Sequence, residues 1–563
     1  MKRLRWQLLI VVVALIAIGV LLVGQQPVTV QPLQPEPVAG GTYAEALIGS
    51  LSRLNPLLAY YNAPDRDVNR LLYSSLIRFD DRGLPLPDLG ESWGISADGT
   101  VYNFSLRQDA FWHDGNPVTA RDVVFTLSLL QDPALPIPDD LRAFWEAVEV
   151  QMLDVYTLQF RLPEPFAPFL DYLDFEILPA HLLEGMSVDE MINAPFNLQP
   201  VGSGPFRFGE LIVENGQIAG VTLLANEAYY AGRPYLDQIT FRYYPDATAA
   251  LTAYQAGDVQ GIARVDDTIL ADALAEPNLN LYTSRLPQLT LVFLNLNDPQ
   301  LPFFQDASIR RALLMGLNRQ WMVDRLLKGQ AILADGPIFP GLWAYYEGTP
   351  RVAFDPQNAV ETIRAAGYTI PAEGGDVRAN ADGVFFAFTL LYPEGEPYEQ
   401  LAQVIQENWR TLGVDVTLRA LPYDELINDH LEKRDYQAAL VDLTLFRSPD
   451  PDPYPFWHQT QITGGQNYAQ WDDRQASEYL EQARITVDPQ ERTRLYRNFQ
   501  VRFANELPAL PLFYPVYTYG VDAAIKGVRI GPIFDTPDRF HTVLMWHVFS
   551  ERGSGLEQPS PTP

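Results

Sequence analysis

Apolar and polar residues alternate in three short stretches of the chain, at 102–106, 156–160 and 239–243. A period of two places the apolar side chains on one face of a strand, so each stretch is expected to be half-buried. A helix is expected after the first strand. Thr119, followed by Asp122 three residues later, matches a capping box before an apolar run. The pattern therefore predicts mixed α/β structure in this half of the chain.

The stretch 384–445 has the clearest layout. Its expected elements are, in order, a strand at 384–392, a helix at 397–412 ended by Gly413, a strand at 414–420, a helix near 423–433 and a strand at 438–446. Strands that alternate with helices predict a parallel sheet covered by helices. Ligands of such sheets bind at the carboxyl ends of the strands, which points to the residues just after Leu445.

The two ends of the chain differ from its globular middle. Three basic residues precede an apolar run, Leu8–Val23, which is either a cleaved signal peptide or an uncleaved membrane anchor. The sequence after Val23 has no clear cleavage site, so residues 1–24 are expected to tether the protein at the outer face of the membrane. Residues 25–40 are rich in Pro and Gln and predict an extended spacer. Residues 550–563 predict a disordered tail.

Composition excludes several classes of function. A chain of 563 residues is expected to hold two or three folding units. Its net charge of −30 repels phosphate backbones and argues against a nucleic-acid partner. The chain has no cysteine, so disulfides, thiolate metal sites, cysteine nucleophiles and a lipid anchor on cysteine are all excluded.

No enzyme motif is evident. The six histidines include no pair at the spacing of a helical metal site, and neither a nucleophile elbow nor a phosphate-binding loop occurs. His113, Asp114 and Gly115 could suggest a catalytic pair, but a tight turn that needs glycine is the better interpretation. Adjacent acids such as Asp266 and Asp267 are expected by chance in so acidic a chain. We therefore expect no catalytic residue, no cofactor and no metal.

A series of motifs resembles one known family. They occur, in family order, at 89–123 (LGESWGISADGTVYNFSLRQDAFWHDGNPVTARDV), 201–206, 226–243, 308–329, 354–368 and 449–457. The chain is similar to the extracellular solute-binding proteins of peptide- and nickel-type ABC transporters (family 5, the oligopeptide- and dipeptide-binding class). The resemblance covers nearly everything from residue 41 to about 545.

This resemblance implies an α/β, two-lobed type 2 periplasmic-binding-protein fold (cluster C-like) with an extra subdomain in lobe one. The implied boundaries are 41–64, 198–286 and 508–549 for lobe one, 65–197 for the extra subdomain and 287–507 for lobe two. A ligand would bind in the interlobe cleft of a monomer, and closure would present the protein to ABC permease subunits in the membrane.

The segment 442–457 is the best candidate site. In peptide-binding relatives this segment supplies an aspartate that pairs with the ligand's amino terminus. One alignment places Arg447 at that position and another places Pro449, so neither preserves the acid; Asp442 and Asp450 are possible substitutes. Arg447 would instead suit a carboxylate or phosphonate, or would simply pair with a neighbouring aspartate.

Further candidates follow from position in the resembling family. The proposed ligand-binding set is Asn55, Tyr61, Asp442, Phe446, Arg447, Asp450, Trp457, Asn467, Tyr468 and Tyr514. Aromatic residues suit a cleft because they bury a large area and keep a polar tip, although each could equally be core.

The sequence thus predicts an extracytoplasmic substrate-binding component of an ABC importer, which captures peptides or a related small solute. The alternative is a solute sensor or chaperone-like binding protein on the same fold, without transport. Neighbouring permease and ATPase genes would favour import, whereas a kinase gene or an isolated gene would favour sensing.

Overall fold

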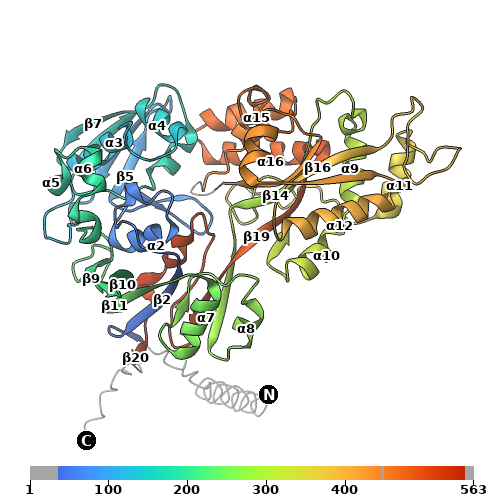
Figure 1. The fold of residues 1–563 in the computed structure, drawn as a ribbon. Coiled ribbons are helices and arrows are strands. Elements are labelled where there is room, and N and C mark those ends of the chain that lie inside the picture. Colours follow the sequence, from blue (N-terminus) through green and yellow to red (C-terminus); the bar gives the residue numbers. More distant parts are fainter. Residues whose placement is uncertain (1–35, 446–448, 552–563) are drawn as a thin grey trace, which may run out of the picture.

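The computed structural model describes residues 36–445 and 449–551, which form two lobes that share one long strand, β19 (Ala509–Asp522) (Figure 1). Most of the sheet strands belong to a single 12-stranded sheet that runs through both lobes. The amino-terminal part of β19 pairs with β14 (Gln288–Leu294), and its carboxy-terminal part pairs with β13 (Leu279–Arg285). The predicted two-lobed α/β fold is confirmed.

Lobe one is built on the strands around β2 (Thr42–Ile48). Its other strands are β9 (Phe206–Glu214), β10 (Gln217–Ala225), β11 (Gln238–Tyr244), β12 (Gly261–Ile262) and β13. Strands β11 and β12 lie parallel to β2 on either side of it, as expected for a sheet with buried faces. Helices α7 (Ala247–Ala256) and α8 (Leu270–Ala275) pack their apolar residues with the β2 and β12 side chains Ala46 and Ile262.

The extra subdomain has its own antiparallel sheet. Its strand order is β5 (Gly90–Ile95), β6 (Val101–Leu106), β8 (Thr157–Arg161) and β7 (Glu149–Asp154). Tyr102, Phe104 and Leu106 are buried on one face, which confirms the strand predicted from alternation. The helices are α2 (Ala63–Leu72), α3 (Ala120–Leu130), α4 (Asp139–Glu146), α5 (Ala180–Leu183) and α6 (Val188–Ile192). The helix predicted after Thr119 is α3.

Lobe two is a three-layer unit. The strands of its sheet are β14, β16 (Ala387–Pro393), β17 (Asp415–Leu421) and β18 (Ala438–Thr444), with the short β15 (Ala331–Leu333) beside β19. Side chains of β14 alternate between two cores: Val292 and Leu294 face one, and Leu291 and Phe293 face the other. Because both faces are covered, the strands are apolar throughout.

Helices cover both faces of the lobe-two sheet. One core includes residues of α9 (Ala307–Met315), α11 (Pro356–Ala365) and α12 (Tyr398–Thr411); the other includes residues of α15 (Arg474–Ile485) and α16 (Pro489–Glu506). Between β17 and β18 lie α13 (Tyr423–Glu425) and a π-helical turn, Leu426–Leu431. Gly413 follows α12 with a φ of 83°, as predicted, and β16 is parallel to both β17 and β18.

The first and last described segments pair with each other on lobe one. Strand β1 (Glu36–Val38), expected to be spacer, pairs with β20 (Phe549–Glu551), expected to include the start of the tail. The difference arises because backbone groups of the two segments bond to each other, which composition alone does not indicate. The predicted anchor and most of the predicted tail lie outside the described residues. Within residues 36–445 and 449–551, no helix is long and apolar enough to cross a bilayer.

Candidate ligand-binding site

A small cavity lies where the two lobes meet. It is lined by Arg285 and Pro287 at the crossing from β13 to β14, and by Leu445 and Pro451 on the loop after β18. Phe339, Leu342, Ile533 and Phe534 also line it among the residues that the structure describes. The cavity has a volume of about 10 Å³, which is space for one water molecule. Because Leu445 directly follows β18, the cavity lies at the carboxyl end of that strand, where ligands of parallel sheets bind.

The lobes touch each other directly around this cavity. The backbone N–H of Trp343 in lobe two donates to the carbonyl of Arg82, at a distance of 3.0 Å. Gly83 has a φ of +77°, and a Cβ built on it would lie 3.2 Å from Pro449. The guanidinium of Arg484 lies 5.4 Å from the centre of the Phe166 ring. The structure is therefore a closed arrangement of the lobes.

Arginines of lobe two anchor the loop that follows β18. The carboxylate of Asp450 is buried and forms an ion pair with Arg492 at 2.7 Å. Asp452 pairs with Arg484, also at 2.7 Å. The backbone N–H of Asp450 donates to the carboxylate of Asp171, whose pKa is raised by burial and by the charge of Asp450. A half-buried carboxylate of the extra subdomain and a buried carboxylate of lobe two therefore lie close together where the lobes meet.

Two candidates on this loop, Phe446 and Arg447, lie outside the described residues. Asp442 lies on β18 and accepts hydrogen bonds from Thr290 Oγ1 (2.5 Å), from Gln288 Nε2 (2.5 Å) and from the hydroxyl of Tyr398. Burial raises the pKa of Asp442. Three donors of the same lobe therefore engage this carboxylate in the closed arrangement.

Two candidate asparagines are buried in loop-closing bonds. Asn55 accepts from the N–H of Leu57 and donates to Asn197 Oδ1, both at 3.2 Å. Asn467 donates to the carbonyl of Trp471 (2.9 Å) and accepts from its N–H (3.0 Å). Both side chains therefore fix the shape of loops.

The aromatic candidates fall into two groups. Trp457 packs against Phe293 in the lobe-two core, Tyr468 donates to Glu432 Oε1 at 2.5 Å, and Tyr514 donates to the carbonyl of Gly336 at 2.7 Å. These three rings are buried. Tyr61 is 74% exposed and is the aromatic candidate open to solvent among those that the structure describes.

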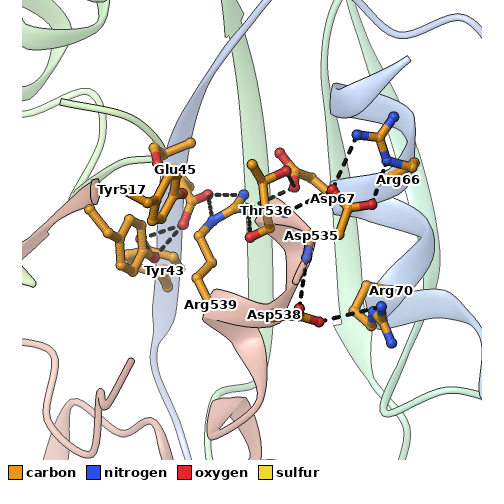
Figure 2. Close-up of polar contacts among 12 residues, drawn as sticks. Tyr43, Glu45, Arg66, Asp67, Arg70, Tyr517, Asp535, Thr536, Asp538 and Arg539 are labelled. Carbon is orange, nitrogen blue, oxygen red and sulfur yellow. Dashed lines mark hydrogen bonds and ion pairs between the residues drawn. The ribbon is translucent and has the colours of Figure 1, made fainter. Parts of the chain in front are cut away.

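A polar network holds the wall of the cavity that lobe one supplies (Figure 2). Arg539 donates to Glu45 of β2 at 2.6 Å and to Asp67 of α2 at 2.6 Å, and all three side chains are buried. Asp535 pairs with Arg66 at 2.8 Å. The segment that carries Phe534 is thereby fixed to both a strand and a helix of lobe one.

The motifs that could suggest a catalytic pair or a metal site make structural contacts instead. His113 to Gly115 form a turn in which Gly115 has a φ of +90°. His113 Nδ1 accepts from the N–H of Gly202, and burial lowers the pKa of His113 to about 4. Asp266 is half-buried and accepts from the N–H of Thr268. Among the described residues, no group of three potential ligands is placed to hold a metal ion.

The family of the chain follows from comparison with known proteins. The family model described as bacterial extracellular solute-binding proteins, family 5, matches residues 85–466. The chain belongs to this family. Its members are extracytoplasmic solute-binding proteins rather than enzymes.

Relatives in this family cover most of the chain. The oligopeptide-binding protein AppA of Bacillus subtilis is 29% identical over 88% of this chain and 90% of its own length. Its solved structure, in complex with a nonapeptide, covers 91% of this chain and 99% of that chain, with a TM-score of 0.64 and 27% identity. The dipeptide-binding protein of Escherichia coli is 25% identical over 88% of this chain and 94% of its length.

Sequence reasoning missed the arginines of the site. Arg285 lies at the end of a strand, and Arg484 and Arg492 lie on two helices far along the chain from the residues they meet. No local pattern distinguishes them from other arginines. Pairing of Arg447 with Asp450 or Asp452, one of the two alternatives for that residue, involves a position outside the described residues. The described arginines that pair with Asp450 and Asp452 are Arg492 and Arg484.

Proposed function

We propose that this chain captures peptides between its two lobes and delivers them to the permease of an ABC importer. Membership of a solute-binding family carries the proposal, together with the nonapeptide complex of its relative AppA. A peptide would enter an open cleft and be enclosed when the lobes close. Two backbone connections, β13–β14 and β19, link the lobes and would bend on closure.

Several residues are proposed to contact the peptide. Tyr61 is exposed beside Tyr60 in lobe one, and Phe446 and Arg447 follow β18, whose end lines the interlobe cavity. The remaining candidates are buried or half-buried in this structure and are proposed to line the ligand-binding cleft; they are Asn55, Asp442, Asp450, Trp457, Asn467, Tyr468 and Tyr514.

We also propose the predicted domain boundaries and a membrane tether at Leu8–Val23. The charge and length of that apolar run support the tether. Washing membranes with carbonate distinguishes the outcomes. The full chain should remain with the membrane, whereas release of the protein would contradict an uncleaved anchor.

Thermal unfolding of the purified full-length protein in detergent tests the binding function. Pools of di- to nonapeptides should raise the melting temperature, since a ligand that binds only the folded state stabilises it by mass action. Calorimetry on the responding pool then gives the affinity. If no pool changes the melting temperature and calorimetry detects no heat of binding, peptide capture is wrong.

A further inference from the structure

Arg285 is the last residue of β13, at the point where the chain leaves lobe one. Its side chain is half-buried and lines the interlobe cavity, and its guanidinium lies 5.9 Å from the centre of the Phe339 ring. Among the described residues, this guanidinium makes no hydrogen bond and no ion pair. Burial lowers the pKa of Arg285 to about 10, and the groups that oppose this shift are two tyrosines, Tyr514 and Tyr345.

Other arginines with a lowered pKa are satisfied by the backbone. Arg310 donates to the carbonyls of Phe304 and Leu507, at 2.6 and 2.9 Å. Arg319 donates to the carbonyls of Ala334 and Pro511, at 2.7 and 2.9 Å. Those two guanidiniums have clear structural roles. Arg285 is less deeply buried than they are, but it makes no such contacts among the described residues.

The lack of a countercharge is unusual for this chain, which has 70 acidic and 40 basic residues. A partly buried cation without a partner is unfavourable unless another group supplies the negative charge. The guanidinium fork matches a carboxylate with two parallel hydrogen bonds. The other described residues that line the cavity beside Arg285 are apolar, which would strengthen such a pair.

We propose that Arg285 binds a carboxylate of the captured peptide, a role that rests on the proposed function. The group is the terminal carboxylate or an acidic side chain. The cavity of about 10 Å³ is too small for a peptide, so the lobes close less tightly around ligand than in this structure. Gly341 lies beside the Arg285 guanidinium and leaves it room, since a Cβ at this position would lie 3.4 Å from Nη1 of Arg285.

Matched peptides test this role by calorimetry. The probes are alanine pentapeptides with a free carboxyl terminus, the same peptides as amides, and amides that carry one Glu or one Gln. Wild type should bind a carboxylate-bearing peptide at least about tenfold tighter than its neutral counterpart. R285Q should lose this preference, and R285K should keep part of it. R325Q removes an exposed positive charge from lobe two and should keep the full preference for carboxylate-bearing peptides.

The two pairs of probes distinguish the terminal carboxylate from the side-chain carboxylate. Equal binding of both members of each pair by wild type overturns the proposal, as does a preference that survives in R285Q. If no pentapeptide binds wild type, the proposed function is in question, and sodium acetate at constant ionic strength becomes the probe. A rise in melting temperature for wild type but not for R285Q then supports the role of Arg285, and its absence overturns it.

Ligand-free stability provides a second measurement. If Arg285 is kept for a ligand, R285Q should unfold in urea at the same or a higher midpoint than wild type, because an uncompensated charge is removed. A clearly lower midpoint for R285Q would show that Arg285 supports the fold, and would contradict the proposal.

Discussion

Arg539 illustrates how much one buried charge can matter. Its guanidinium has no exposed surface and meets Glu45 and Asp67, both buried. Removing the arginine would leave two carboxylates without their cation. We expect Arg539→Met to lower the free energy of unfolding by about 3–5 kcal/mol in urea titrations. Arg529→Met, at an exposed site, is the control and should change stability by less than about 0.5 kcal/mol. Similar losses in the two variants would show that the pairs are unimportant.

Asp65 should make stability depend on pH. Its buried carboxylate accepts from the N–H groups of Ser52 and Arg53, and burial raises its pKa to about 6 from 3.8. Between these values the folded state binds a proton that the unfolded state does not. The contribution of Asp65 to the free energy of unfolding is therefore largest below about pH 4 and is lost as pH rises through about 6.

Asp65→Asn removes this titration. The stability of wild type relative to Asp65→Asn should rise by up to about 2–3 kcal/mol between about pH 8 and pH 4.5. Urea unfolding at several pH values measures the difference, and Asp189→Asn at an exposed site is the control. A difference that does not vary with pH would contradict a raised pKa.

Single residues of the site were hard to predict because their roles depend on tertiary contacts. Tyr514 and Asn467 stand in positions that suit a cleft, but each side chain is buried and bonded within its own lobe. Arg285 is conspicuous only once its surroundings are known, since what distinguishes it is that no hydrogen bond or ion pair reaches its guanidinium from residues 36–445 and 449–551. Periodicity reports which face of an element is buried, not which residues meet across lobes.

Elements were predicted more reliably than contacts. The strands at 102–106 and 239–243 and the alternating layout of lobe two are local patterns, and the structure confirms them. Strand β19 was anticipated only as the return to lobe one. Its pairing with both β13 and β14 joins segments more than 200 residues away, which no local signal encodes.

The start of α3 supplies a prediction for an element. Asp122 Oδ2 accepts from the N–H of Thr119 at 2.8 Å, and Oδ1 accepts from the N–H of Ala180 at 2.9 Å. One carboxylate thus caps α3 and ties the beginning of α5 to it. Asp122→Ala should lower the free energy of unfolding by about 2–3 kcal/mol, because buried N–H groups lose their hydrogen-bond acceptor. Thr119→Ala, which leaves these two bonds in place, should cost about 1 kcal/mol or less. Equal losses in urea unfolding would contradict the bridging role.

At the scale of the whole molecule, closure depends on close approach between lobes. Gly83 lies in the turn between β3 (Ile77–Phe79) and β4 (Pro85–Pro87), and a Cβ there would meet Pro449 at 3.2 Å and the Phe534 ring at 3.3 Å. Gly383 has nearly the same φ, +79° against +77°, but nothing lies within 4 Å of its Cβ position. Alanine at either site adds a similar backbone strain of about 1 kcal/mol.

Only Gly83→Ala places a methyl group between the lobes. We expect it to shift the ligand-free molecule towards an open arrangement, with a larger radius of gyration in X-ray scattering. Gly383→Ala should lose similar stability yet scatter like wild type. If both variants scatter like wild type, the contact of Gly83 with Pro449 and Phe534 does not limit closure. If Gly83→Ala and Gly383→Ala open the molecule equally, backbone strain rather than contact between the lobes controls closure.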